Sequence, residues 1–450
     1  MLAAAMLTAM ITTFMGSALN LSVPGLEQYF HASARMVSWV VSAYTIAIAM
    51  MSLPLGKIAD LRGRRRVFLL GIAGFGLLSI LCAFAWDIRV LLALRAVQGV
   101  TAAMIFATNN AILISAYPHS QQGRVLGLST AATYIGLTAG PVLGGILDTA
   151  FGWRSIFLMA AALSACAFCA AARFAPRDAR KADGAGQDVR GAALYISAVA
   201  LSLYGLTNLT ASWAGPVCFA AGAALIAAFF LAESRTAEPM MKVSMFRESR
   251  TFTFSNLAAL LNYAATFAIS YSFSIYLQTV RGFSSSRAGL ILILMPLLQA
   301  VFSPLMGSLS DRIRPSILAS GGMGCCALAL VLMTRIGEGT GMPWILAVLA
   351  LTGFGFAMFS SPNNNAIMNC VAPPDYGIAN AIIATMRTYG QSAGMAILSV
   401  VTGAVLGEGT LEGAAAGQVI RLLRISFTIF AVLCLMGLFF SLARDREKQE

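Results

Sequence analysis

Long apolar runs with few charges alternate with short polar segments along the whole chain. A helix needs about twenty apolar residues to cross the hydrocarbon core of a bilayer, so each run is long enough for a membrane span. We therefore predict an all-α transmembrane protein with fourteen spans. They cover residues 4–24, 37–56, 67–86, 90–115, 123–147, 154–174, 191–211, 214–232, 252–279, 288–310, 316–335, 343–368, 377–406 and 422–443.

The composition agrees with this pattern. The chain is 58% hydrophobic and only 11% charged, which is far too apolar for a soluble protein. Its net charge of +12 is scattered over short loops, and this distribution argues against nucleic-acid binding. The first 25 residues lack a basic n-region and run too long for a signal peptide, so we interpret them as the first span.

The distribution of Lys and Arg predicts the orientation. If the N-terminus is cytoplasmic, twenty of these residues fall on the inner side and eight on the outer side, as the positive-inside rule requires. We therefore expect both termini in the cytoplasm of a bacterial-type plasma membrane. Two arginines, Arg95 and Arg387, remain inside spans, whereas no carboxylate falls in the middle of one.

The metal-ligating residue types form no recognisable site. The cysteines lie mostly in apolar runs, and Cys166-x-x-Cys169 falls inside a predicted span without flanking ligands, so we interpret them as packing residues. The two histidines, His31 and His119, lie in loops. We expect no metal and no cofactor.

A weak internal repeat divides the chain into two halves. Gly56-Lys-Ile-Ala-Asp60 follows the second span and Gly307-Ser-Leu-Ser-Asp311 follows the tenth, each continuing into basic residues. Such symmetry is typical of transporters built from repeats. The predicted division is an N-terminal six-helix half at 1–174, a cytoplasmic linker at 175–190, an inserted helix pair at 191–232, an amphipathic segment at 233–251 and a C-terminal six-helix half at 252–450.

The amphipathic segment contains an apolar pattern after Pro239, a residue that suits a first helical turn. We predict a short helix in the inner membrane interface, and a loop without such a helix is the alternative. The predicted apolar face consists of Met240, Met241, Val243, Met245 and Phe246, with Lys242, Arg247 and Arg250 outside it.

Three motifs stand out in the N-terminal half. In the first, Gly56 and Gly63 allow close helix approach and a tight turn, and Asp60 can face a helix N-terminus, beside the basic residues Arg62 and Arg64. In the second, small residues four apart form a packing groove and a proline bends the helix. This motif comprises Gly136, Gly140, Pro141, Gly144 and Gly145.

The third motif is Arg95-Ala-Val-Gln98-Gly99. A guanidinium in hydrocarbon is costly, and residues three apart share a helix face, so Arg95 and Gln98 are expected to point into a polar cavity. The alternative is that Arg95 hydrogen-bonds carbonyl groups of a bent neighbouring helix.

Together these motifs resemble the major facilitator superfamily and, within it, the fourteen-span drug–proton antiporters. The resemblance implies two six-helix halves plus two inserted helices. It implies that the Asp60 motif, with Asp311 as its counterpart in the repeat, latches the halves on the inner face. It also implies that the Pro141 motif marks exporters and that Arg95 takes part in proton coupling.

The sequence departs from this family in the first span, where Gly16 stands at a position that is aspartate in many relatives. A cavity with an arginine and no carboxylate favours neutral or anionic ligands over cations. A rim residue such as Glu27 or Asp148 could supply the acid instead.

Neutral polar residues within the spans are the remaining candidates for a substrate cavity. Arg387 and Gln391 are four apart and share a face, although Arg387-x-x-Gly390-x-x-x-Gly394 also resembles an architectural pattern of the family's thirteenth span. The predicted coupling and substrate residues are Arg95, Gln98, Asn20, Asn109, Arg387, Gln391, Asn262 and Asn363.

We expect a monomeric secondary transporter that works by alternating access in the lipid bilayer and exports small amphipathic substrates in exchange for protons. A dedicated exporter of an endogenous anionic or lipid-like metabolite is the alternative. A membrane enzyme or receptor is a remote one, because no catalytic constellation or large soluble loop is visible.

Overall fold

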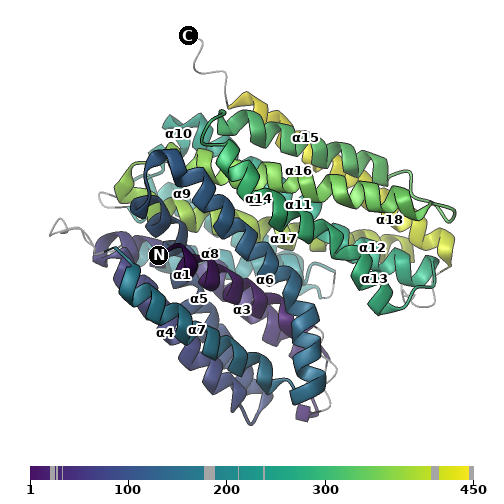
Figure 1. Cartoon of the computed structure of the whole chain (residues 1–450), viewed down its shortest axis with the longest axis horizontal. Helices are drawn as coiled ribbons and strands as arrows, with labels where there is room; N and C mark the ends of the chain where they lie inside the picture. Colours follow the sequence, from purple (N-terminus) through teal and green to yellow (C-terminus); the bar gives the residue numbers. More distant parts are fainter. Residues whose placement is uncertain are drawn as a thin grey trace. The chain divides into compact units, whose positions relative to one another are not determined.

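The computed structural model of the chain describes residues 1–20, 26, 29–32, 34–176, 188–210, 212–236, 239–406 and 415–444. Every regular element in these residues is a helix (Figure 1). The helices form two compact units. The first comprises Met1–Ala200, Ala224–Val243 and Val371–Thr385, and the second comprises Leu201–Ala223, Ser244–Cys370 and Met386–Glu450.

These units do not follow the predicted divisions at 174, 190, 232 and 251. Three helices pass from one unit to the other: α8 (Val189–Thr207), α9 (Ala214–Glu233) and α17 (Tyr376–Leu406). The division into two halves and an inserted pair therefore stays a prediction. The 175–190 linker lies largely outside the described residues.

In the first unit, α5 packs against α3 and α4, while α7 packs against α1 and α4. Buried Tyr44, Phe68, Phe75 and Phe157 form part of the core between these helices. The helices of this unit are α1 (Leu2–Ser17), α3 (Ala34–Arg62), α4 (Arg64–Ala83), α5 (Ile88–Ala116), α6 (Gln122–Phe151) and α7 (Arg154–Phe174), with short turns η1 (Ala18–Asn20), η2 (His119–Gln121) and η4 (Pro373–Asp375).

In the second unit, α16 packs against α14 and α15, and α18 packs against α11 and α15, as Figure 1 shows. Its helices are α10 (Ser244–Glu248), α11 (Arg250–Thr266), α12 (Ala268–Ile275), α13 (Ser285–Leu292), α14 (Leu294–Leu309), α15 (Pro315–Met333), α16 (Met342–Asn369) and α18 (Ala416–Ala443), with the π-helical turn η3 (Tyr276–Val280).

Side-chain hydrogen bonds cap the N-termini of two helices. Asp87 caps α5 by accepting a hydrogen bond from the Arg89 amide at 2.7 Å. Ser249 caps α11 in the same way, since its hydroxyl accepts from the Phe252 amide at 3.1 Å. Such caps satisfy amide groups that have no partner within the helix.

Each of the fourteen predicted spans overlaps a helix or a run of consecutive helices, but the number of qualifying spans differs. Within the described residues, twelve helical stretches are long and apolar enough to cross a membrane. The turn η2 with the first part of α6 (His119–Gly140) and the last part of α6 (Leu143–Phe151) qualify when taken together, and the two stretches are inclined by 42° at a break that contains Pro141. Helix α1 is shorter than a span, because its regular part ends at Ser17.

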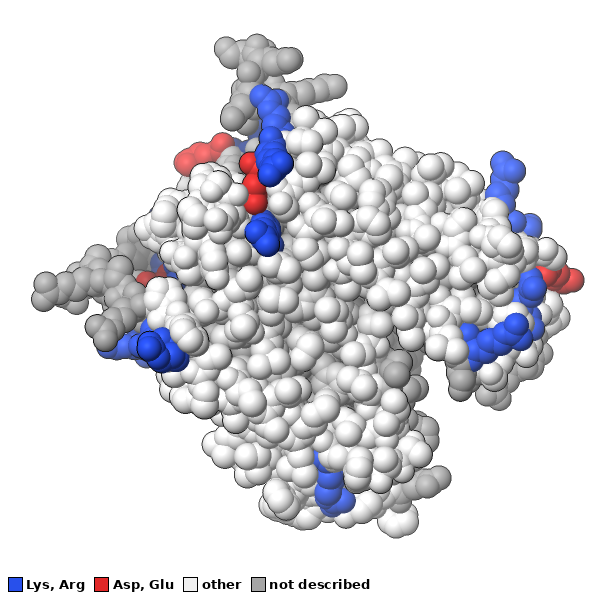
Figure 2. Space-filling view, viewed as in Figure 1, with Lys and Arg blue, Asp and Glu red and all other residues white. Residues whose placement is uncertain are grey.

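One face of the protein is largely uncharged (Figure 2). In the face shown in Figure 2, Lys, Arg, Asp and Glu gather in a few places, and uncharged residues cover the area between them. Large apolar side chains such as Leu70, Leu305 and Phe439 are more than half exposed. This surface suits contact with lipid, and the chain is a multi-pass membrane protein.

The amphipathic segment differs from its prediction. Among the described residues between α9 and α11, only Ser244–Glu248 is helical, and it makes a single short turn of the predicted helix. Met240 and Met241 are buried within the first unit rather than available to the membrane interface, each with 2% of its surface exposed. A short apolar pattern fits burial against protein as well as against lipid, which is why the sequence could not separate the two.

Candidate functional site

Arg95 lies in α5 and is fully buried in the first unit. Its Nε donates to the carbonyl of Val40 in α3 at 3.3 Å, and its Nη2 donates to the carbonyl of Met15 in α1 at 3.2 Å. Its Nη1 donates to Gln98 Oε1 at 2.7 Å, and the guanidinium lies 4.2 Å from the centre of the Tyr44 ring. Three helices thus converge on one cation.

Arg95 and Gln98 share a face, as predicted, but that face meets protein and not an open cavity. Gln98 continues the network by donating to Ser79 Oγ of α4 at 2.8 Å. Among the described residues, Arg95 forms no ion pair, and backbone carbonyls are its principal acceptors. This arrangement matches the alternative in which Arg95 binds carbonyl groups, and its role in coupling stays a prediction.

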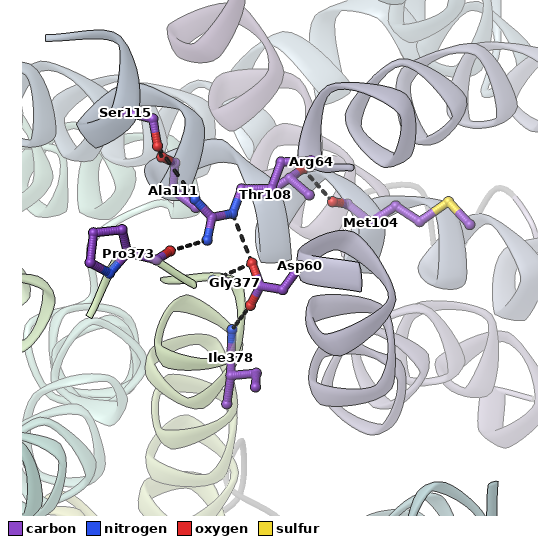
Figure 3. A network of polar contacts seen from close by, with 9 residues as sticks. All are labelled: Asp60, Arg64, Met104, Thr108, Ala111, Ser115, Pro373, Gly377 and Ile378. Carbon is purple, nitrogen blue, oxygen red and sulfur yellow. Dashed lines mark hydrogen bonds and ion pairs between the residues drawn. The ribbon is translucent and has the colours of Figure 1, made fainter. Parts of the chain in front are cut away.

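A second polar network lies where α3 ends and α17 begins (Figure 3). The Asp60 carboxylate accepts hydrogen bonds from the amides of Gly377 and Ile378, each at 3.2 Å, in the first turn of α17. Arg64 Nε donates to Asp60 Oδ1 at 2.7 Å, and Arg64 also donates to the carbonyl of Pro373. A carboxylate at a helix N-terminus is stabilised both by the amides and by the helix dipole.

The two glycines of this motif are required for different structural reasons. Gly63, between α3 and α4, has φ 107°, a left-handed conformation that strongly favours glycine. A Cβ at Gly56 would lie 2.8 Å from the carbonyl oxygen of Gly377, so glycine permits the close approach of α17. Arg62 is exposed and has no polar partner among the described residues.

Further contacts hold the same part of α17 in the first unit. Asn110 of α5 donates to Asn380 Oδ1 at 2.8 Å, and Asn380 donates to the carbonyl of Phe106. Just before α17, Asp375 forms a 3.0 Å ion pair with the exposed Lys242. Residues 371–385 are therefore attached at several points.

The second predicted motif forms a close seam between α1 and α6. Thr13 Oγ1 donates to the carbonyl of Thr133 at 2.9 Å, and Ser17 Oγ donates to that of Leu137 at 3.2 Å. A Cβ at Gly136 or Gly140 would overlap α1, and one at Gly144 would lie 2.6 Å from the carbonyl oxygen of Ala18. Gly145 is partly exposed.

The other predicted residues do not gather at a single described point. Asn109 donates to Ser129 Oγ at 3.2 Å between α5 and α6, and Asn262 donates to Met323 Sδ at 3.0 Å between α11 and α15. Arg387 and Gln391 are partly buried in α17, in the second unit, and Asp311 is partly buried just after α14. The side chains of Asn20 and Pro141 lie outside the described residues, as does Glu27.

The glycines near Arg387 favour the architectural interpretation of its motif. A Cβ at Gly390 would lie 2.5 Å from the carbonyl oxygen of Leu260, and one at Gly394 would overlap Ala264. Both glycines thus let α17 pack closely against α11.

Sequence reasoning missed two buried charged residues. Arg444, placed in the cytoplasmic tail, is buried and donates to Ser255 Oγ and Asn363 Oδ1 at 2.9 Å and to the Ser316 carbonyl at 2.8 Å. Glu233, placed in an inner loop, is also buried. Each stands at the end of an apolar run, and that position was the only available signal.

Comparison with known proteins identifies the family. The sequence profile of the Major Facilitator Superfamily matches residues 5–245 and 256–450. The chain is 32% identical over 405 residues to the multidrug resistance protein Stp of Mycobacterium tuberculosis, covering 87% of this chain and 73% of that one. It is 28% identical over 393 residues to the riboflavin transporter RibZ of Clostridioides difficile, covering 86% and 85%.

Solved structures share the fold. The proton:xylose symporter XylE superposes with a TM-score of 0.71 at 13% identity, covering 98% of this chain and 94% of that chain. The human organic anion transporter MFSD10 superposes with a TM-score of 0.70 at 19% identity, covering 98% of both chains. The chain therefore belongs to the Major Facilitator Superfamily, whose members carry small molecules across lipid membranes and are not enzymes.

Proposed function

We propose that this protein is a secondary active exporter of amphipathic small molecules that works by alternating access and exchanges its substrate for protons. Relatives named for multidrug and antibiotic resistance support this proposal, including Stp and the methylenomycin A resistance protein of Streptomyces coelicolor. The protein acts as a monomer in a bacterial-type plasma membrane.

One contact supports the proposed alternating-access mechanism. The Asp60 carboxylate binds the first turn of α17, a helix that belongs in part to each unit. Breaking these bonds frees that turn from α3, whereas forming them holds it. A contact of this kind can alternate between two states, as alternating access requires.

The proposed topology has fourteen spans with both termini in the cytoplasm. Helix α1 belongs to the first span, and α6 crosses as one bent span. Helices α8 and α9 form the inserted pair. Cysteine labelling from each side of the membrane at His119 and Gly339, in loops that this topology places on opposite sides, tests the assignment.

A dedicated exporter of an endogenous anionic or lipid-like metabolite is the second candidate. The anionic form of this candidate is favoured by Arg95, which has no carboxylate partner among the described residues. Similarity to a riboflavin transporter supports a carrier dedicated to one metabolite. Arg95 then contributes an uncompensated positive charge that disfavours cations in its surroundings.

Purified protein in vesicles that contain a pH-sensitive dye distinguishes the two candidates. Proton movement on adding a cationic amphiphile supports the multidrug antiporter, and a response restricted to an anionic amphiphile supports the second candidate. If the transport rate of both probes is independent of an imposed pH gradient, the result contradicts proton exchange. Vesicles without protein, and vesicles whose pH gradient has been collapsed by an ionophore, are the controls.

A further inference from the structure

Two carboxyl groups face each other where α8 begins and α9 ends. Asp188 directly precedes α8, and its Oδ1 accepts a hydrogen bond from the Gly191 amide at 2.8 Å. Glu233 is the last residue of α9. A Cβ at Gly191 would overlap both Glu233 Oε1 and Asp188 Oδ2, so these two oxygens converge over that glycine. Both oxygens lie within 2.5 Å of the position of that Cβ, so they are at most about 5 Å apart.

Glu233 supplies a second, independent observation. Only 2% of its surface is exposed, and its Oε2 accepts a hydrogen bond from the Met241 amide at 2.9 Å. Its Oε1 is buried and has no hydrogen-bond donor among the described residues. Two ionised carboxylates only accept hydrogen bonds, so these oxygens can bond to each other only if one of them carries a proton.

No cation in the described residues neutralises the pair. Lys57 of α3 donates to the carbonyl of Pro239 at 3.0 Å, and Lys242 forms its ion pair with Asp375. Arg190 and Arg235, the basic residues nearest in sequence, are exposed, and their side chains have no polar partner among the described residues. Within the described residues, a proton is the partner that would let these two carboxyl groups lie together.

The segment Pro239–Val243, termed the strap, connects this pair to α3. Met241 binds Glu233 through its amide, and the side chains of Met240 and Met241 are buried. Pro239 receives the hydrogen bond from Lys57, which stands three residues before Asp60 in α3. The strap is thus held at one point by Glu233 and at another by α3.

We propose that Asp188 and Glu233 form a proton-binding site that shares one proton and thereby holds the strap in place. Loss of the proton breaks one carboxyl O–H bond, transfers the proton to water and leaves two adjacent carboxylates. Their repulsion drives Glu233 toward solvent, and the buried Met241 amide then loses its acceptor. This inference rests on the site alone and not on the proposed export function.

Infrared spectroscopy of the purified full-length protein tests the shared proton directly. Ordinary Asp and Glu side chains ionise near a pH of about 4. We expect the carbonyl band of a protonated carboxylic acid to persist at neutral pH, to disappear at alkaline pH, and to be absent at neutral pH from both Glu233→Gln and Asp188→Asn. The exposed Glu248→Gln is the matched control and should keep the band.

Hydrogen exchange of the strap tests the consequence. After correction for intrinsic rates, we expect protection of residues 239–243 in the wild type to fall at least about tenfold between about pH 6 and about pH 9. Glu233→Gln should keep the protection at both pH values, because its amide can donate to Asp188 while its carbonyl accepts from Met241.

Several results would overturn the proposal. If the wild-type protein lacks the carbonyl band at neutral pH, the proposal is wrong, whether or not the variants fold. It is also wrong if the band survives in both Glu233→Gln and Asp188→Asn. Equal loss of strap protection in the wild type and Glu233→Gln removes the link to the strap. If Glu233→Gln does not fold, Asp188→Asn carries the same comparison.

Discussion

Replacing Asp60 by asparagine tests the contact that we place at the centre of the transport cycle. The aspartate accepts two amide hydrogen bonds from the first turn of α17 and a third from Arg64, and its side chain is only 7% exposed. Asparagine keeps one acceptor oxygen, but its NH₂ group then faces a donor. The variant also loses the negative charge at the helix N-terminus.

The expected cost follows from these losses. A hydrogen bond to a charged group contributes about 1.5–3 kcal/mol, and an anion at a helix N-terminus contributes about 0.3–1 kcal/mol. We therefore expect the attachment of α17 to weaken by about 2–4 kcal/mol. At about 1.4 kcal/mol per factor of ten, the equilibrium between attached and released α17 shifts by about 30- to 700-fold.

Asp375→Asn is the matched control. It makes the same substitution in the residue just before α17, but the partner there is Lys242, whose side chain is 57% exposed. An exposed ion pair contributes about 0–1 kcal/mol, so the expected shift is below about fivefold.

Distances between spin labels provide the assay. Labels at the exposed positions Arg62 and Ala372, in a cysteine-free background, report whether the start of α17 lies against the end of α3. Asp60→Asn should enlarge the population with a longer distance, and Asp375→Asn should not. Identical distance distributions for Asp60→Asn and the wild type would refute the reasoning.

Three further predictions concern stability, measured by thermal unfolding in detergent. Arg95→Ala removes the donor to the buried Gln98 Oε1 and the hydrogen bonds to the carbonyls of Met15 and Val40. A buried acceptor left without a donor costs about 1–3 kcal/mol, so the unfolding midpoint should fall below the wild-type value; an unchanged midpoint would mean that Arg95 does not tie the three helices together. Gly140→Ala should destabilise the protein by about 1–3 kcal/mol because its methyl group overlaps Ser17. The control Gly417→Ala, whose methyl group meets no atom within 4 Å, should change stability by less than about 0.5 kcal/mol. Equal effects of the two variants would contradict close packing between α1 and α6 at Gly140. Arg444→Gln should lose about 2–4 kcal/mol of stability with its hydrogen bonds, and a near-neutral result would show that this buried cluster is dispensable.

The helical architecture was readable from the sequence because apolar runs long enough for a membrane are rare by chance. The resemblance of the motifs to the superfamily is confirmed by the profile match. Gly63 and Asp60 were interpretable because each has a chemical requirement: a left-handed conformation for the glycine and a helix N-terminus for the acid.

The remaining site could not be derived in this way. The sequence marked Arg95 as costly, but its acceptors are backbone carbonyls, which every residue carries and no pattern distinguishes. Glu233 is bound by the strap residue Met241, which lies eight residues further along the chain, and the pattern of the strap suited lipid equally well. Burial at the end of a helix is set by whichever segment covers it, and that is a tertiary property.

The attachment of α17 to α3 can form only late in the synthesis of the chain. Asp60 and the amide of Ile378 are 318 residues apart in sequence. At about 5–20 residues per second, a ribosome needs about 15–60 s to reach α17 after making α3. For that interval, the nascent first unit contains a carboxylate whose helix partner does not yet exist. The N-terminal bundle therefore reaches its final form only after most of the polypeptide has entered the membrane.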